Sequence, residues 1–110
     1  MASFKTKIGT GSPLLGTFLQ IPASEVTEIV GGAGFECGIV DTEHGMMGTD
    51  GALRLLRAAD GAGLTTILRV PDVNHHLITQ ALDFGASAVM VPNIQDRRAA
   101  ENFGIYAHNA

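Results

Sequence analysis

The sequence has little that would link the chain to disulfides, membranes or nucleic acids. Cys37 is the single cysteine, which excludes a disulfide within the chain, and its apolar neighbours are typical of a buried, unreactive thiol. No segment approaches the ~18 apolar residues that a membrane-spanning helix needs. The seven Lys and Arg residues are scattered and the formal net charge is -4, so we expect no basic face for a phosphate backbone. These features favour a cytoplasmic protein that binds neither nucleic acids nor membranes.

Short apolar segments recur along the 110 residues, and helix-like segments separate them. Strands are predicted at 14–20, 37–40, 65–70 and 88–91. Their starts are 23, 28 and 23 residues apart, which is typical of repeated strand-plus-helix units and not of hairpins. The segments are apolar throughout, as in parallel sheets with both faces covered. A hydrophobic share of 45% suffices for the core of one compact domain.

Polar side chains follow each predicted strand, which favours a barrel over an open sheet. In (β/α)8 barrels the active site is assembled from the carboxyl ends of several strands. The glycine-rich segment GTGSP (9–13) precedes the first strand instead of following it, so a dinucleotide site has only weak support. We predict an α/β fold of about four parallel strand-helix units, the N-terminal half of a TIM barrel. The polar residues after the strands are Gln20; Asp41, Glu43 and His44; Arg69; Asn93 and Gln95.

Four segments together resemble one enzyme family. They are GFECGIVDTEHG (34–45), ILRVP (67–71), QALDFGA (80–86) and VPNIQ (91–95), and the combination of D-x-E-H with L-R-V-P is the most specific part. The chain resembles the HpcH/HpaI aldolases, class II pyruvate-dependent enzymes of the 4-hydroxy-2-oxoheptanedioate and 2-dehydro-3-deoxyglucarate aldolase type. The resemblance runs from about Gly16 to Ala100. Beyond it the helical pattern is predicted to break down at FGIYAHNA, so we interpret residues 1–110 as a partial, truncated domain of this family.

The resemblance implies roles for three residues. His44, oriented by Asp41, corresponds to the acid-base pair that moves the proton in aldol cleavage, and Arg69 corresponds to the arginine that holds the pyruvate carboxylate or enolate oxygen. Chemistry agrees, because a histidine titrates near neutrality and a carboxylate three residues away on a turn can fix its tautomer. A D-x-x-H segment can also be an ordinary solvated turn, and a strand-end arginine can simply pair with a neighbouring acid. Both alternatives stay open.

Two further carboxylates belong to the same pattern. Glu43 corresponds to a residue that either hydrogen-bonds neighbouring loops or holds water on a metal. Asp83 corresponds to a family aspartate at a helix end that approaches the site of a neighbouring subunit, and an exposed helix-end carboxylate is the plainer interpretation. The family binds a divalent metal (Mg, Mn or Co) through a glutamate after the fifth strand and an aspartate after the sixth. Those ligand positions have no counterpart among these residues.

Two functions from different classes follow. The first is a carbon-carbon lyase that reversibly cleaves 4-hydroxy-2-oxo acids to pyruvate and an aldehyde, with a small 2-oxo acid as its substrate. The second is a catalytically inactive half barrel that serves as an interaction or oligomerisation module. A half barrel leaves two unpaired edges and one bare inner face, so we expect a homo-oligomer or pairing with another barrel half.

Overall fold

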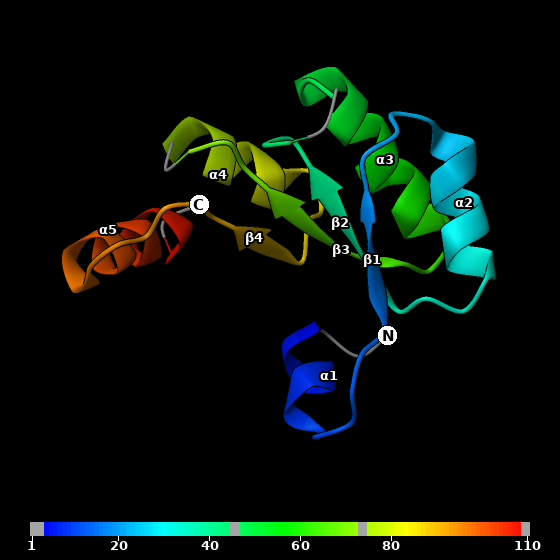
Figure 1. Ribbon diagram of the computed structural model, residues 1–110, viewed down its shortest axis with the longest axis horizontal. Coiled ribbons are helices and arrows are strands. Elements are labelled where there is room, and N and C mark those ends of the chain that lie inside the picture. The colour runs from blue at the N-terminus through cyan, green and yellow to red at the C-terminus, as the bar shows by residue number, and fades with distance from the viewer. Residues whose placement is uncertain (1–3, 45–46, 73–74, 109–110) are drawn as a thin grey trace.

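The strands and helices alternate along the chain. A computed structural model describes residues 4–44, 47–72 and 75–108. It contains, in order, α1 (Phe4–Gly9), β1 (Gly16–Leu19), α2 (Ser24–Gly32), β2 (Cys37–Asp41), α3 (Thr49–Gly61), β3 (Thr65–Arg69), α4 (His75–Asp83), β4 (Ala88–Met90) and α5 (Arg97–His108) (Figure 1). All four predicted strands are confirmed, each within two residues of its expected ends.

The four strands form one sheet in the order β1-β2-β3-β4, and every neighbouring pair is parallel. Helices α2, α3 and α4 each return the chain between successive strands, so the carboxyl ends of all strands lie along the same edge of the sheet. Figure 1 shows α2, α3, α4 and α5 as a row, with α2 at one end and α5 at the other, and α1 apart from it. This is the arrangement of consecutive strand-helix units in a (β/α)8 barrel. The predicted fold class is confirmed.

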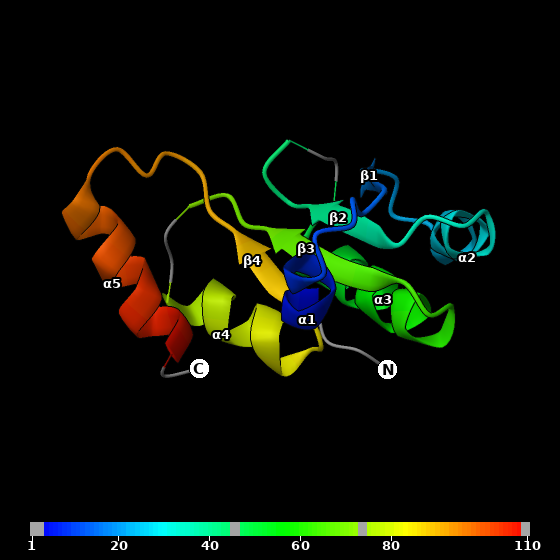
Figure 2. The same ribbon diagram turned by 90° about the horizontal axis from the view of Figure 1, so that it is seen from below.

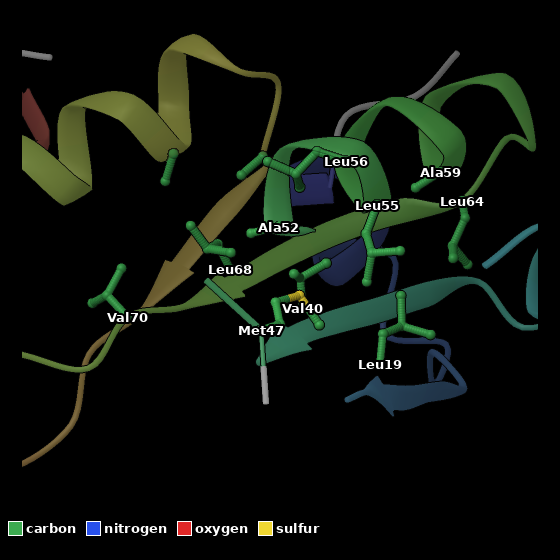
Figure 3. Packing of buried hydrophobic residues seen from close by; sticks show 12 residues of the cluster. Leu19, Val40, Met47, Ala52, Leu55, Leu56, Ala59, Leu64, Leu68 and Val70 are labelled. Atoms are coloured by element: carbon green, nitrogen blue, oxygen red, sulfur yellow. The ribbon is translucent and has the colours of Figure 1, made fainter. Parts of the chain in front are cut away.

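The core lies between the sheet and α3. Four residues of α3 are buried at the helical spacing i, i+3, i+4 and i+7, namely Ala52, Leu55, Leu56 and Ala59. They pack against strand residues that include Val40 and Leu68, which are 0% and 7% exposed (Figure 3). The apolar stripe of α3 and the buried side of the sheet therefore account for most of the hydrophobic burial.

The other face of the sheet has no helical layer over it in the described part of the chain. Burial along β3 alternates, with Thr66 and Leu68 buried and Ile67 and Arg69 only partly buried. Phe18 on β1 is 48% exposed. This is the inner face that a half barrel was expected to leave bare, and the apolar strand sequences reflect a barrel interior that these four strands alone do not enclose.

Two terminal segments differ from expectation. Helix α1 was not predicted, since it has only six residues, yet Lys7 Nζ donates a hydrogen bond of 3.2 Å to Thr65 Oγ1 at the start of β3. The predicted break at FGIYAHNA is wrong, because α5 continues to His108. Asp96 Oδ1 accepts the Ala99 N–H at 2.8 Å at the start of α5, which supports the helix, and a single interior glycine costs a helix only about 1 kcal/mol.

Cys37 is buried at the start of β2, as expected. A Cβ atom at Gly16, its register partner on β1, would clash with its sulfur. Burial, followed by the nearby carboxylate of Glu36, raises the pKa of the Cys37 thiol. The thiolate form is thus disfavoured, as in an inert structural cysteine. Across the described ranges, no helix has the length and apolar character needed to cross a bilayer.

Candidate functional site

Three strand ends bring polar side chains together at the carboxyl edge of the sheet. Asp41 is the last residue of β2 and Arg69 the last residue of β3, and the two are register partners. Gln20 directly follows β1, next to the paired residues Leu19 and Val40. The sequence places a polar residue after each apolar run, and the parallel register turns those three positions into one row.

The centre of the site is an ion pair between Asp41 and Arg69. Asp41 is fully buried, and the Arg69 side chain is 17% exposed. Arg69 Nε donates to Asp41 Oδ1 at 3.0 Å, and Nη2 donates to Oδ2 at 2.5 Å. This is the two-pronged geometry in which a guanidinium binds a carboxylate most strongly. Arg69 is the main reason that the pKa of Asp41 lies well below its usual range, against the opposing effect of burial. The same hydrogen bonds raise the pKa of Arg69.

Asp41 also holds the chain around it. Its Oδ2 accepts the Gln20 side-chain amide at 2.8 Å, and its Oδ1 accepts the backbone N–H groups of Glu43 and His44, both at 3.0 Å. With the two bonds from Arg69, five donors reach this one carboxylate. A carboxylate offers about four lone-pair directions, so Asp41 is saturated.

The expected contact between the Asp41 carboxylate and the His44 ring is therefore corrected. Asp41 bonds to the backbone N–H of His44 instead, because a carboxylate at a strand end readily accepts the N–H groups two and three residues further along a turn. Asp41 fixes the direction of the turn that carries the histidine. It has no spare acceptor for the imidazole.

Glu43 is the carboxylate nearest to the His44 ring. Its Oε1 lies 3.7 Å from Nδ1 of His44 and 3.6 Å from Nε of Arg69. The Glu43 side chain is 18% exposed and the His44 side chain 65% exposed. Glu43 thus lies between the histidine and the arginine, and both of its expected roles, bonding to neighbouring loops and holding water on a metal, stay predictions. The imidazole stands open to solvent at the rim of the site.

Phe18 forms the apolar side of the site, and the sequence did not single it out. The Cζ atom of Arg69 lies 4.9 Å from the centre of the Phe18 ring, a cation-π distance. Side chains two residues apart in an extended segment point to the same side, so Phe18 could have been predicted to lie on the same side as Gln20. Of the five N–H donors of a guanidinium, Asp41 uses two. The alternative in which Arg69 pairs with a neighbouring acid is thus observed, and Asp41 leaves three of the N–H donors of Arg69 unused.

The other predicted residues lie apart from this cluster. Asp83 ends α4 and is exposed. Gly85 and Ser87, just after it, line the same small hollow as Gly63 and Thr65, at the amino end of β3 and so opposite Arg69. Within this chain Asp83 does not reach the Asp41 site, and its approach to a neighbouring subunit stays a prediction. Asn93 and Gln95 follow β4 and are exposed.

The described residues do not suit a divalent metal. Residues 4–44, 47–72 and 75–108 contain no group of three or more His, Cys, Asp and Glu side chains that could hold an ion. Asp41 is saturated by hydrogen bonds from nitrogen donors, which leaves Glu43 as the acidic side chain with oxygen to spare at the site. Mg²⁺ in proteins usually keeps several waters and is bound through one or two carboxylates, and Glu43 supplies at most one of these.

Comparison with known proteins identifies the family. The model of the HpcH/HpaI aldolase/citrate lyase family matches residues 14–107. The chain belongs to this family. The match passes Ala100, where the sequence resemblance was expected to end, and includes nearly all of α5. The family membership inferred from D-x-E-H and L-R-V-P is confirmed.

Curated relatives share about a third of the aligned residues. A hydroxypyruvate/pyruvate aldolase of Agrobacterium fabrum is 33% identical over 99 residues, which are 90% of this chain and 37% of the relative. A 4-hydroxy-2-oxovalerate aldolase of Novosphingobium aromaticivorans is 33% identical over 90% of this chain and 38% of the relative. A 4-hydroxy-2-oxo-heptane-1,7-dioate aldolase of Salmonella dublin is 31% identical, over 91% and 38%. The chain spans less than two fifths of the length of these relatives.

Solved structures give the same fold. An HpcH/HpaI aldolase of Desulfitobacterium hafniense superposes with a TM-score of 0.88 and 27% identity over 97% of this chain and 42% of that protein. The citrate synthase SbnG superposes with a TM-score of 0.86 and 32% identity over 92% and 41%. The four strand-helix units are therefore those of the N-terminal half of an HpcH/HpaI TIM barrel.

Proposed function

We propose that the chain carries the acid-base and carboxylate-binding part of an aldolase site for 4-hydroxy-2-oxo acids. The main support is the cluster of Asp41, Arg69 and His44 at one carboxyl edge of a parallel sheet, in a chain of the HpcH/HpaI family. The aldolase names of the relatives agree with this reaction class.

In this proposal each residue has one task. The neutral imidazole of His44 removes the proton from the C4 hydroxyl of the substrate, and the C3–C4 bond breaks to release an aldehyde. The electron pair of that bond moves to the C2 carbonyl, which gives the enolate of pyruvate. Arg69 holds the carboxylate and the enolate oxygen with its remaining donors, and the protonated His44 returns the proton to C3.

Asp41 is a positioning residue in this scheme. Its carboxylate fixes the Arg69 fork and, through the backbone N–H of His44, the turn that carries the imidazole. Glu43 lies beside the imidazole, with its Oε1 3.7 Å from Nδ1 of His44. The divalent metal implied by the family has no ligand set among the described residues, so the proposal assigns it no step.

Pyruvate release from 4-hydroxy-2-oxovalerate tests the proposal, with and without added Mn²⁺. His44→Ala should lower the rate about 100-fold or more, the usual contribution of a positioned general base. His76→Ala is the matched control, since His76 is an exposed histidine at the start of α4. A rate that is the same for the wild-type chain and His44→Ala, in both conditions, rules out the catalytic role.

The second candidate, a non-catalytic interaction module, has its own support. β1 is an edge strand flanked by exposed apolar side chains, and the described residues form no metal cluster. Wild-type protein that is folded and associates but releases no pyruvate favours this function.

A further inference from the structure

Gln20 belongs to the site but has no task in the proposed reaction. It directly follows β1, and the register of β1 with β2 places it beside Asp41. Its neighbour along the chain, Leu19, is buried in the core against α3. Figure 2 shows α3 and α4 together on one side of the sheet. Side chains alternate along an extended segment, so the Gln20 side chain lies on the other side, away from these helices.

The Asp41 carboxylate fixes which end of the Gln20 amide faces it. Gln20 Nε2 donates to Asp41 Oδ2 at 2.8 Å. The hydrogen bonds from Arg69 keep the pKa of Asp41 well below its usual range, so at neutral pH the carboxylate is ionised and can only accept hydrogen bonds. The NH2 end of the amide must therefore face Asp41. The amide oxygen Oε1 is turned away from the carboxylate.

The amide oxygen of Gln20 is free to accept a hydrogen bond. In the part of the chain that the structure describes, no donor reaches Oε1, and the bond to Asp41 is the one that the side chain makes. Gln20 is also exposed. An amide oxygen has two lone pairs, so both are open to a donor that a ligand brings.

Asp41 does not need the Gln20 amide to be satisfied. Two donors from Arg69 and the backbone N–H groups of Glu43 and His44 already supply four hydrogen bonds. A carboxylate has about four lone-pair directions. The fifth bond, from Gln20, therefore does more to orient the amide than to hold the carboxylate.

The two oxygens of Asp41 separate Gln20 from the turn that carries the histidine. Gln20 Nε2 shares Oδ2 with Nη2 of Arg69, whereas the backbone N–H of His44 binds Oδ1. The amide thus lies beside the end of the guanidinium. In the proposed reaction that guanidinium holds the carboxylate and the C2 oxygen of the substrate. The substituents of C3 are then the next groups along the substrate to come near Gln20.

We propose that Gln20 is a specificity-determining residue that binds a hydroxyl group on C3 of the substrate. The C3 hydroxyl of a 3-hydroxy-2-oxo acid donates its hydrogen to Gln20 Oε1 while Arg69 holds the carboxylate. Hydroxyl groups are the donors that such acids carry, and a neutral amide oxygen accepts them without adding charge to the site. This role rests on the proposed function, because Arg69 must bind a 2-oxo acid for C3 to come near Gln20.

Two acids that differ in one group on C3 test this role by NMR titration of the wild-type chain. Hydroxypyruvate carries a hydroxyl group on C3, and 2-oxobutyrate carries a methyl group in its place. Both have the carboxylate and the keto group that the proposed site binds. Hydroxypyruvate should bind about three- to tenfold more tightly than 2-oxobutyrate, which corresponds to one neutral hydrogen bond.

Gln20→Met should abolish this preference. Methionine keeps the length of the side chain but has no carbonyl oxygen, so the two acids should bind the variant with similar affinity. Gln20→Leu also lacks the oxygen and should give the same result. Gln95→Met is the matched control, because Gln95 is an exposed glutamine beyond β4, and it should keep the wild-type ratio of affinities. Circular dichroism verifies that each variant is folded.

The two affinities separate the role of Gln20 from the proposed function. If Gln20 only supported Asp41, its replacement would weaken both acids equally and leave their ratio unchanged. Equal binding of both acids by the wild-type chain, or a wild-type ratio in the Gln20 variants, overturns the role of Gln20 and leaves the site at Arg69 in place. Binding of neither acid by the folded wild-type chain overturns the proposed site at Arg69 and the role of Gln20 with it.

Discussion

Asp41 and Arg69 are partners twice, once in the register of β2 and β3 and once through a two-pronged ion pair. The register places their Cα atoms side by side at the carboxyl edge of the sheet. The ion pair then joins the two strand ends, and Thr42 adds to this by donating its backbone N–H to the Arg69 carbonyl at 3.0 Å. The geometry of the candidate site therefore depends on the same contacts that hold the two central strands in register.

Asp41→Asn should lower the thermal stability of the chain. The amide keeps the shape of the side chain but loses its charge, and its NH2 group would face donors of Gln20 or Arg69 where an acceptor is required. Thermal unfolding followed by circular dichroism measures the effect. Asp60→Asn is the control, because Asp60 is an exposed carboxylate on α3. Equal midpoints for the two variants would show that the ion pair contributes nothing to folding.

Acid should lower the stability of the wild-type chain more than it lowers the stability of the Asp41→Asn variant. The pKa of Asp41 is lower in the folded chain than the ordinary value of 3.8, so the unfolded chain binds this proton first as the pH falls. The stabilisation from Asp41 is complete above about pH 4 and is lost progressively as the pH falls toward the folded-state pKa. Melting curves between pH 2 and pH 7 measure this. Parallel pH profiles for the wild type and Asp41→Asn would contradict the assignment.

The strands and the edge that carries the site were predictable from the sequence, for a physical reason. A buried parallel strand must be apolar, so the first polar residue after each run marks where the strand leaves the core, as Asp41 and Arg69 do. The helices were predictable from apolar residues that recur every three to four positions, as they do in α3.

The contacts inside the site were not predictable in the same way. Whether Asp41 bonds to Arg69 or to the His44 ring depends on strand register and on the path of a short turn. Neither is encoded in local periodicity. The same holds for Phe18, whose position beneath Arg69 depends on how β1 aligns with β2 and β3. Helix α1 was missed because six residues carry too little pattern to be recognised.

Gly31→Ala should destabilise the packing of α2 on α3. A Cβ at Gly31 would lie 2.9 Å from the Ala62 Cβ and 3.1 Å from the Ala62 carbonyl oxygen, too close without a shift of the backbone. We expect a loss of about 1–3 kcal/mol in the free energy of unfolding. Gly32→Ala is the matched control, with no atom within 4 Å of the added Cβ, and should gain up to about 1 kcal/mol from helix propensity. Urea unfolding measures both, and equal shifts would refute the close approach of the two helices.

Arg69→Lys should weaken the binding of a 2-oxo acid while the fold persists. Lysine keeps the charge but lacks the planar fork, so one ammonium group cannot hold Asp41 with two bonds and a ligand carboxylate as well. Titration with pyruvate, followed by NMR, should show a dissociation constant raised about tenfold or more, the loss expected for a charge-assisted contact. Arg54→Lys on the exposed side of α3 is the control and should bind pyruvate as the wild type does. Unchanged affinity in Arg69→Lys, with a normal circular dichroism spectrum, would leave Arg69 as a structural partner of Asp41 alone.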